Sequence, residues 1–173
     1  MRYIIIIFIF LFFSFNVYAQ KIATFKFQLI LENLKTYNEF KIQINEFKKK
    51  KFIELKKEEE ILTIKQNEIS DSRILLSESE YLKISSEFNE LKIDFENKVN
   101  ILNNYLKENI ELNEKLILNE IIQIVKKIAV ENNIDIIFFD EQYFLASDKV
   151  DISDIIYNEL NNIAIKLQLL EYE

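Results

Sequence analysis

The sequence contains no glycine, proline, cysteine, histidine or tryptophan. Without cysteine and histidine it lacks the common ligands of zinc, haem and iron–sulfur centres, and it has no disulfide, no thiol chemistry and no histidine-based catalytic triad. Without glycine it has neither a Walker loop nor a dinucleotide-binding fingerprint. Carboxylates, lysine, serine, threonine and tyrosine remain, so we expect no enzyme, no catalytic residue and no cofactor.

One cluster of carboxylates lies in the C-terminal part of the chain: Asp135, Asp140, Glu141, Asp148, Asp151 and Asp154. Acidic residues are common at turns and at the first positions of helices, where they accept hydrogen bonds from backbone N–H groups. We therefore expect structural roles for most of them and no metal ligand, with a divalent-ion site as the alternative.

The first nineteen residues have the order of a secretory signal. Arg2 precedes an apolar run over Tyr3–Phe13, and Val17 and Ala19 fit the −3 and −1 positions of a cleavage site. The apolar run is shorter than the ~20 residues needed to cross a bilayer. We predict cleavage after Ala19, with an uncleaved membrane anchor as the alternative.

The charges of the remaining chain are unevenly distributed. Cleavage would leave 21 basic and 29 acidic residues, a net charge of −8. Residues 34–131 are nearly balanced with 17 basic and 19 acidic side chains, whereas residues 132–173 carry 2 basic and 9 acidic ones. Nucleic-acid binding would call for a net basic face, so we expect no nucleic-acid partner.

Residues 34–131 have the periodicity of two long helices, which we expect to form an antiparallel hairpin with its tip near residues 71–79. Ser77 and Glu80 form an S-x-x-E capping box at the start of the second helix. Three–four spacing predicts the seam of each helix. The first-arm seam is Tyr37, Phe40, Ile44 and Phe47, then from a new origin Phe52, Leu55, Glu59, Leu62, Gln66, Ile69, Arg73 and Leu76. The second-arm seam is Tyr81, Ile84, Phe88, Leu91, Phe95, Lys98, Leu102, Tyr105, Asn109, Leu112 and Leu116.

The phase slip in the first arm falls at Lys48–Lys51. It predicts local irregularity in that arm. The lysine run itself is most simply a solvated helix face, and a weak contact with an anionic membrane surface or an acidic partner segment is the alternative.

The flanking residues 20–33 and 132–173 predict a small α+β body. Alternating residue types favour a strand over residues 22–27. An apolar run predicts a buried strand over residues 134–139, and a weaker pattern predicts an edge strand over residues 143–146. The stretch from Ile152 to Leu170 has helical spacing and predicts a final amphipathic helix.

Three short strings in this order resemble the Skp (OmpH) family of periplasmic chaperones. They are Lys21-Ile22-Ala23 at the predicted mature start, the strand that begins Asn133-Ile134-Asp135, and Ala146–Ser153, which contains the family's D-x-x-D-I-S pattern. The Leu76-Ser77 tip is also similar to the family's hairpin turn. The resemblance covers the whole predicted mature chain.

This resemblance implies a homotrimer in which a shared strand-containing body projects three helical hairpins around a cavity. It implies an ATP-independent periplasmic holdase that keeps unfolded outer-membrane β-barrel proteins from aggregating; a structural coiled-coil spacer or adaptor of the cell envelope is the alternative. Known members are basic and this chain is acidic, so no client-contacting residue is carried over. The apolar residues expected in the trimer body are Ile22, Phe25, Phe27, Ile134, Ile136, Phe138 and Phe144.

Overall fold

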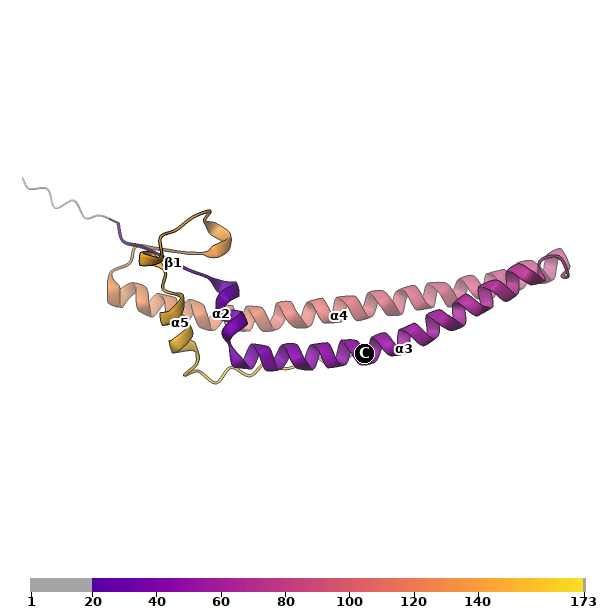
Figure 1. The fold of residues 1–173 in the computed structure, drawn as a ribbon, viewed down its shortest axis with the longest axis horizontal. Coiled ribbons are helices and arrows are strands. Elements are labelled where there is room, and N and C mark those ends of the chain that lie inside the picture. Colours follow the sequence, from indigo (N-terminus) through magenta and orange to yellow (C-terminus); the bar gives the residue numbers. More distant parts are fainter. Residues whose placement is uncertain (1–19, 173) are drawn as a thin grey trace, which may run out of the picture.

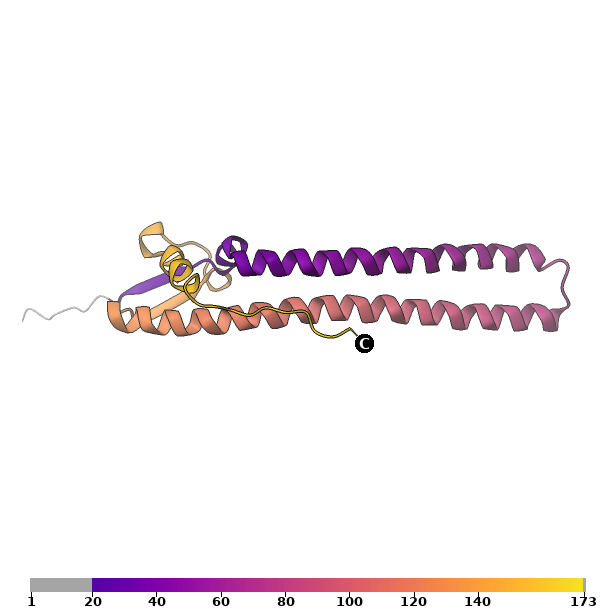
Figure 2. The ribbon, with the colours of Figure 1, turned by 90° about the horizontal axis from the view of Figure 1, so that it is seen from below.

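The structure, a computed structural model, describes residues 20–172. The predicted signal segment, residues 1–19, lies outside the described residues. Two long helices dominate the molecule: α3 (Lys35–Ser72, 38 residues) and α4 (Glu78–Asn132, 55 residues). At ~1.5 Å per residue they are about 57 and 82 Å long. They lie side by side as a hairpin that bows along its length and projects from a small body at one end (Figure 1, Figure 2).

The turn of the hairpin is fixed by the predicted capping box, which the structure confirms. The Ser77 hydroxyl accepts a hydrogen bond from the Glu80 backbone N–H, and the Glu80 carboxylate accepts one from the Ser77 backbone N–H at 3.0 Å. Two of the backbone donors at the start of α4 are thereby satisfied, so the helix begins directly after the turn.

The seam of the first arm differs from the predicted one beyond Phe47. Phe52 is 63% exposed and Glu59 also faces solvent, while Lys51 and Glu58 are partly buried. The interior positions advance as 44, 47, 51, 55, 58 and 62. This average step is close to the 3.6 residues of an undistorted helix, so the seam needs no new origin.

The second-arm seam also changes phase, at Asn109. The predicted positions Leu112 and Leu116 are each 39% exposed, and Asn113 and Ile117 are buried in their place. From Tyr105 to Ile121 the buried positions advance by four residues at a time. The three–four alternation therefore failed where the helix enters the body and packs against more than the opposite arm.

The body contains a two-stranded parallel sheet. Strand β1 (Ile22–Phe25) pairs with β2 (Ile136–Phe139), with Ile22 opposite Ile136 and Phe25 opposite Phe139. The hairpin connects the two strands, which run in the same direction. Asn133 ends α4 in the left-handed conformation with φ of 51°, a position that Asn tolerates well.

The first and third of the three predicted strands differ from the structure. The first strand ends at Phe25, because Phe27 already begins the short helix α2 (Phe27–Asn33). Residues 143–146 form no strand; they link two 3₁₀ turns, η1 (Asp140–Gln142) and η2 (Asp148–Val150). On that side Thr24 makes only an isolated parallel bridge with Asp151.

The predicted final helix is also too long. Helix α5 (Ser153–Leu160) ends at Leu160, and residues 164–172 run without helix or strand along the hairpin toward its tip (Figure 2). We call residues 163–172 the C-terminal segment. Its partly buried residues Ile165, Leu167 and Leu169 alternate with exposed ones, which is the period of an extended chain rather than of a helix.

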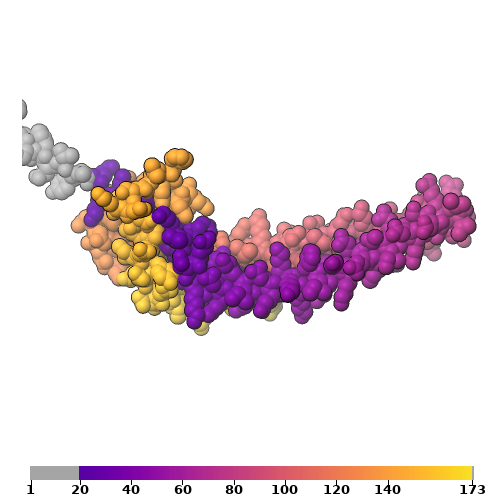
Figure 3. Space-filling view, in the orientation of Figure 1, coloured from indigo at the N-terminus to yellow at the C-terminus, as the bar shows by residue number. Residues whose placement is uncertain are grey.

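The core lies where α2, α5 and the C-terminal half of α4 meet. Ile117, Ile121, Ile156 and Leu160 are completely buried there, and Leu31 is nearly so. The space-filling view shows this body as the thick end of the molecule, with the hairpin extending from it (Figure 3). The end of α4 buries a broad apolar stripe that fastens the hairpin to the body.

Candidate functional site

The seven apolar residues expected in the body fall into two groups. Phe25 and Phe27 are buried within the chain, and the ring of Phe25 lies 6.1 Å from that of Phe139. The others are partly or largely exposed: Ile134 and Phe138 are half-buried, Ile22 is 41% and Ile136 37% exposed, and Phe144 is fully exposed. The first group stabilises one copy, whereas the second presents apolar surface.

The sheet offers a further surface for association. Among the described residues, no strand pairs with the edge of β2 that faces away from β1. The loop after η1 exposes Leu145 beside Phe144. An unpaired strand edge and exposed apolar side chains are both features to which another chain readily adds.

A cluster of three side chains ties the start of the chain to α5. The Lys26 ammonium lies 2.9 Å from the Asp151 carboxylate, and the Lys26 backbone N–H donates to the Ser153 hydroxyl at 2.8 Å. Burial favours a higher pKa for Asp151, but hydrogen bonds from the Ser153 hydroxyl and backbone N–H and from Lys26 outweigh it and lower the pKa. Asp151 is therefore an ionised structural clasp.

Two other carboxylates of the predicted cluster also have structural roles. Asp135 accepts from the Lys21 backbone N–H at 2.8 Å, and Asp140 accepts from the Phe27 N–H at 3.1 Å, at the start of α2. Within residues 20–172, no group of three or more acidic side chains is placed to hold a metal ion.

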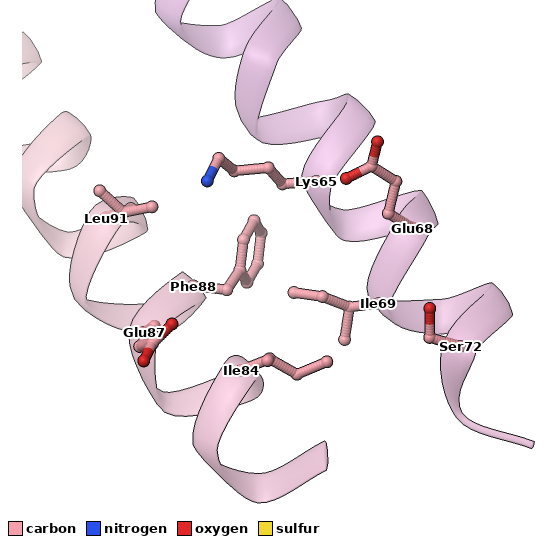
Figure 4. A pocket seen from close by; sticks show the side chains of 8 residues that line it. All are labelled: Lys65, Glu68, Ile69, Ser72, Ile84, Glu87, Phe88 and Leu91. Atoms are coloured by element: carbon pink, nitrogen blue, oxygen red, sulfur yellow. The ribbon is translucent and has the colours of Figure 1, made fainter. Parts of the chain in front are cut away.

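The outer half of the hairpin is incompletely closed. A pocket of about 290 Å³ opens between α3 and α4 near the tip, and Figure 4 shows Ile69, Ile84 and Phe88 pointing into the space between the helices. Lys65, Glu68 and Glu87 supply charge around it.

A second pocket of about 190 Å³ follows along the hairpin. It contains Leu62 and Phe95 and is bordered by Lys98, which contacts Glu58 at 3.0 Å and Asp94 at 2.9 Å. Leu62 and Phe95, which are both predicted seam residues, therefore meet here, but the packing between α3 and α4 remains incomplete.

Large apolar side chains are also exposed along both arms. They are Ile42, Phe52, Ile53, Ile61, Ile64, Leu82, Leu91, Ile93, Ile101, Leu112 and Leu116, of which Ile61 and Leu91 line the pockets. They are interspersed with the nearly balanced charges of this region. Such a surface can make many weak apolar contacts while remaining hydrated.

Asparagine side chains bind the C-terminal segment to α4, which the sequence analysis did not predict. Asn113 brackets Gln168: its Nδ2 donates to the Gln168 carbonyl at 3.1 Å and its Oδ1 accepts from the Gln168 N–H at 3.2 Å. Asn109 Oδ1 accepts from the Leu170 N–H, and the Tyr105 hydroxyl donates to the Leu170 carbonyl, both at 2.7 Å. Burial raises the pKa of Tyr105 and keeps this donor protonated.

Two signals in the sequence could have revealed this contact. Asn109 and Asn113 stand four residues apart on an otherwise apolar helix face, which places two buried amides in line. Ile163, Ile165 and Leu167 alternate with other residues, a period-two pattern that continues to Leu169. The helical interpretation of residues 152–170 concealed the second signal.

Comparison with known proteins gives one family and one fold. The family model described as OmpH, outer membrane protein (OmpH-like), matches residues 21–160. No curated protein matches the sequence. The crystal structure of a candidate outer membrane chaperone (OmpH-like) from Caulobacter crescentus CB15 is similar with a TM-score of 0.62 at 9% identity, covering 90% of this chain and 94% of that one. Within residues 20–172, no helix has the length and apolar character required to cross a membrane.

Proposed function

Because the chain belongs to the OmpH-like family over residues 21–160, we propose that it is a chaperone without enzymatic activity. It acts as an ATP-independent holdase that binds unfolded outer-membrane β-barrel proteins between helical hairpins and prevents their aggregation. The signal segment at residues 1–19 directs it to the periplasm and is removed after Ala19.

The single observation that carries this proposal is the surface of the hairpin. Two arms of about 57 and 82 Å project from the body and carry exposed Ile, Leu and Phe among balanced charges. The open pockets at Phe88 and Phe95 add apolar side chains from the interior. An unfolded chain can be held by many such weak contacts without a defined sequence.

The body supports a homotrimer as the working form. A two-stranded sheet is marginal on its own, and the free edge of β2 with exposed Ile136 and Phe144 would be covered by neighbouring copies. Three copies related by a closed rotation would place three hairpins around a common cavity. The cavity, rather than one hairpin, is the proposed holding site.

Aggregation of an unfolded outer-membrane β-barrel protein after dilution from urea tests the proposal. The protein lacking residues 1–19 should suppress light scattering at stoichiometric ratios without ATP, and equal masses of an unrelated acidic coiled-coil protein serve as the control. Failure to suppress scattering, together with capture of one fixed partner in a pull-down, would instead identify an envelope spacer or adaptor.

A further inference from the structure

The C-terminal segment lies beyond the part of the chain that the family model matches, which ends at residue 160. It is held on α4 by a set of side chains that we call the asparagine strip: Tyr105, Asn109 and Asn113. Both asparagines are essentially inaccessible, at 0% and 1% exposure, and Tyr105 is also buried. The strip is therefore a built site that is filled by a peptide.

The strip recognises backbone rather than side chains. At Gln168 and at Leu170 it satisfies both the N–H and the C=O group, in four hydrogen bonds of 2.7–3.2 Å. In an extended chain the N–H and C=O of one residue point to the same side, and residues two apart share that side. Any extended polypeptide without proline at these two positions offers the same groups.

The strip's second requirement concerns the side chains of the peptide that it binds. Leu167 and Leu169, which flank Gln168, are partly buried against the core, while Gln168 and Leu170 remain exposed. At the end of the segment the Tyr172 ring packs against those of Phe47 and Tyr105, with centroid distances of 5.2 and 4.9 Å. The site therefore favours an extended chain with apolar residues at every second position.

We propose that the asparagine strip is a binding site for extended, unfolded polypeptide with alternating apolar residues, and that the C-terminal segment is its resident competitor. The ligand class rests on the proposed holdase function, because unfolded β-barrel strands have this alternation. When such a strand displaces the segment, Asn109 and Asn113 keep their partners because the incoming backbone supplies the same groups. Displacement thus leaves no buried amide unpaired.

A peptide-binding experiment on the full mature chain tests the site itself. The probe is a fluorescein-labelled peptide with the sequence of residues 163–172, measured by anisotropy. Changing Leu167→Asp and Leu169→Asp in the protein weakens the resident segment but leaves the strip intact. Since a tethered competitor acts at roughly millimolar effective concentration, the probe should bind this release variant at least about tenfold more tightly than the unmodified chain.

The matched variant adds Asn109→Leu and Asn113→Leu, which keep the helix and its apolar face but remove the backbone partners. It should lose the gained affinity, again by about tenfold or more. Equal affinity of the unmodified chain, the release variant and this variant would overturn the proposal. Far-ultraviolet circular dichroism confirms that all three proteins remain helical.

A second measurement needs no variant and identifies the ligand. An unfolded β-barrel segment added in excess to the unmodified chain should raise amide exchange at Gln168 and Leu170 at least about tenfold. Unchanged exchange while the protein still suppresses aggregation would overturn this inference and leave the proposed function standing. Faster exchange without suppression of aggregation would support the site and contradict the holdase.

Discussion

Asn109 and Asn113 show that the role of a buried polar residue depends on the groups that it contacts. From sequence, Asn109 was a polar seam residue of the kind that fixes helix register. In the structure it and Asn113 pair with the backbone of the C-terminal segment, 55 to 61 residues further along the chain. Composition and spacing do not specify such a distant partner, so the sequence revealed the buried amide but not its role.

The role of Asn113 predicts a stability loss on truncation. Asn113→Ala removes both hydrogen bonds to Gln168 and leaves its side of the strip empty, which should cost about 1–2 kcal/mol in the free energy of unfolding. Urea denaturation measures the loss, and amide exchange at Gln168 should accelerate in parallel. Asn104→Ala, at an exposed position of the same helix, is the control and should change stability by less than about 0.5 kcal/mol.

The ion pair and hydrogen bonds of Asp151 predict that removing its charge lowers the stability of the fold in a pH-dependent way. Asp151→Asn keeps the shape and removes the charge, so it should lower the free energy of unfolding at pH 7 by about 1–2 kcal/mol. Because the folded-state pKa lies below the ordinary value of 3.8, the stabilisation is complete above that value and is lost as the pH falls through the folded-state pKa. The difference between the two proteins should therefore shrink in acid.

Thermal unfolding between pH 3 and pH 7 measures this convergence. Glu141→Gln, at an exposed position of η1, is the matched control and should follow the unmodified protein at every pH. A difference between Asp151→Asn and the unmodified protein that stays constant down to pH 3 would show that the Asp151 charge does not support the fold.

Among the elements, the two long helices were predictable, whereas the short helices and the connections were not. Long helical periodicity and the Ser77 capping box are local signals, and both are present in the structure. Residues 143–146 and 161–170 depend on contacts far along the chain, and there the local patterns gave a strand and a helix that do not form. The short alternation over 163–169 was compatible with two structures, and the asparagine strip decides between them.

The turn of the hairpin offers a test at the scale of elements. Ser77→Ala removes the capping box and should destabilise the first turn of α4, at a cost of about 0.5–2 kcal/mol. Amide exchange should accelerate over residues 78–82 while the body is unchanged. Ser86→Ala, on an exposed helical position, is the control, and equal exchange in both variants would show that the cap does not fix the tip.

At the scale of the whole molecule, the body and the hairpin differ in how their apolar side chains are covered. The body buries Phe25 and Phe27 but leaves Ile136, Phe144 and the β2 edge uncovered. The hairpin becomes less tightly packed away from the body, where fully buried residues give way to open pockets. These features suit a molecule whose body assembles and whose arms hold a changing ligand.

The uncovered body residues predict the effect of a charged substitution on assembly. Phe144→Asp should weaken trimer formation because it places a carboxylate in the proposed interface, and sedimentation velocity should then show smaller species at micromolar concentration. Because Phe144 is fully exposed in one copy, the helical content of each copy should not change. Lys149→Gln, in the neighbouring exposed 3₁₀ turn, changes the net charge by the same one unit and is the control; it should leave the trimer intact.

In the proposed assembly, three copies enclose one unfolded client. Native mass spectrometry of the mature protein, mixed with an unfolded outer-membrane β-barrel protein, detects this complex by its mass. The expected principal species has the mass of three copies plus one client, and without client the protein should be a trimer. A monomeric protein accompanied by free client would rule out this assembly.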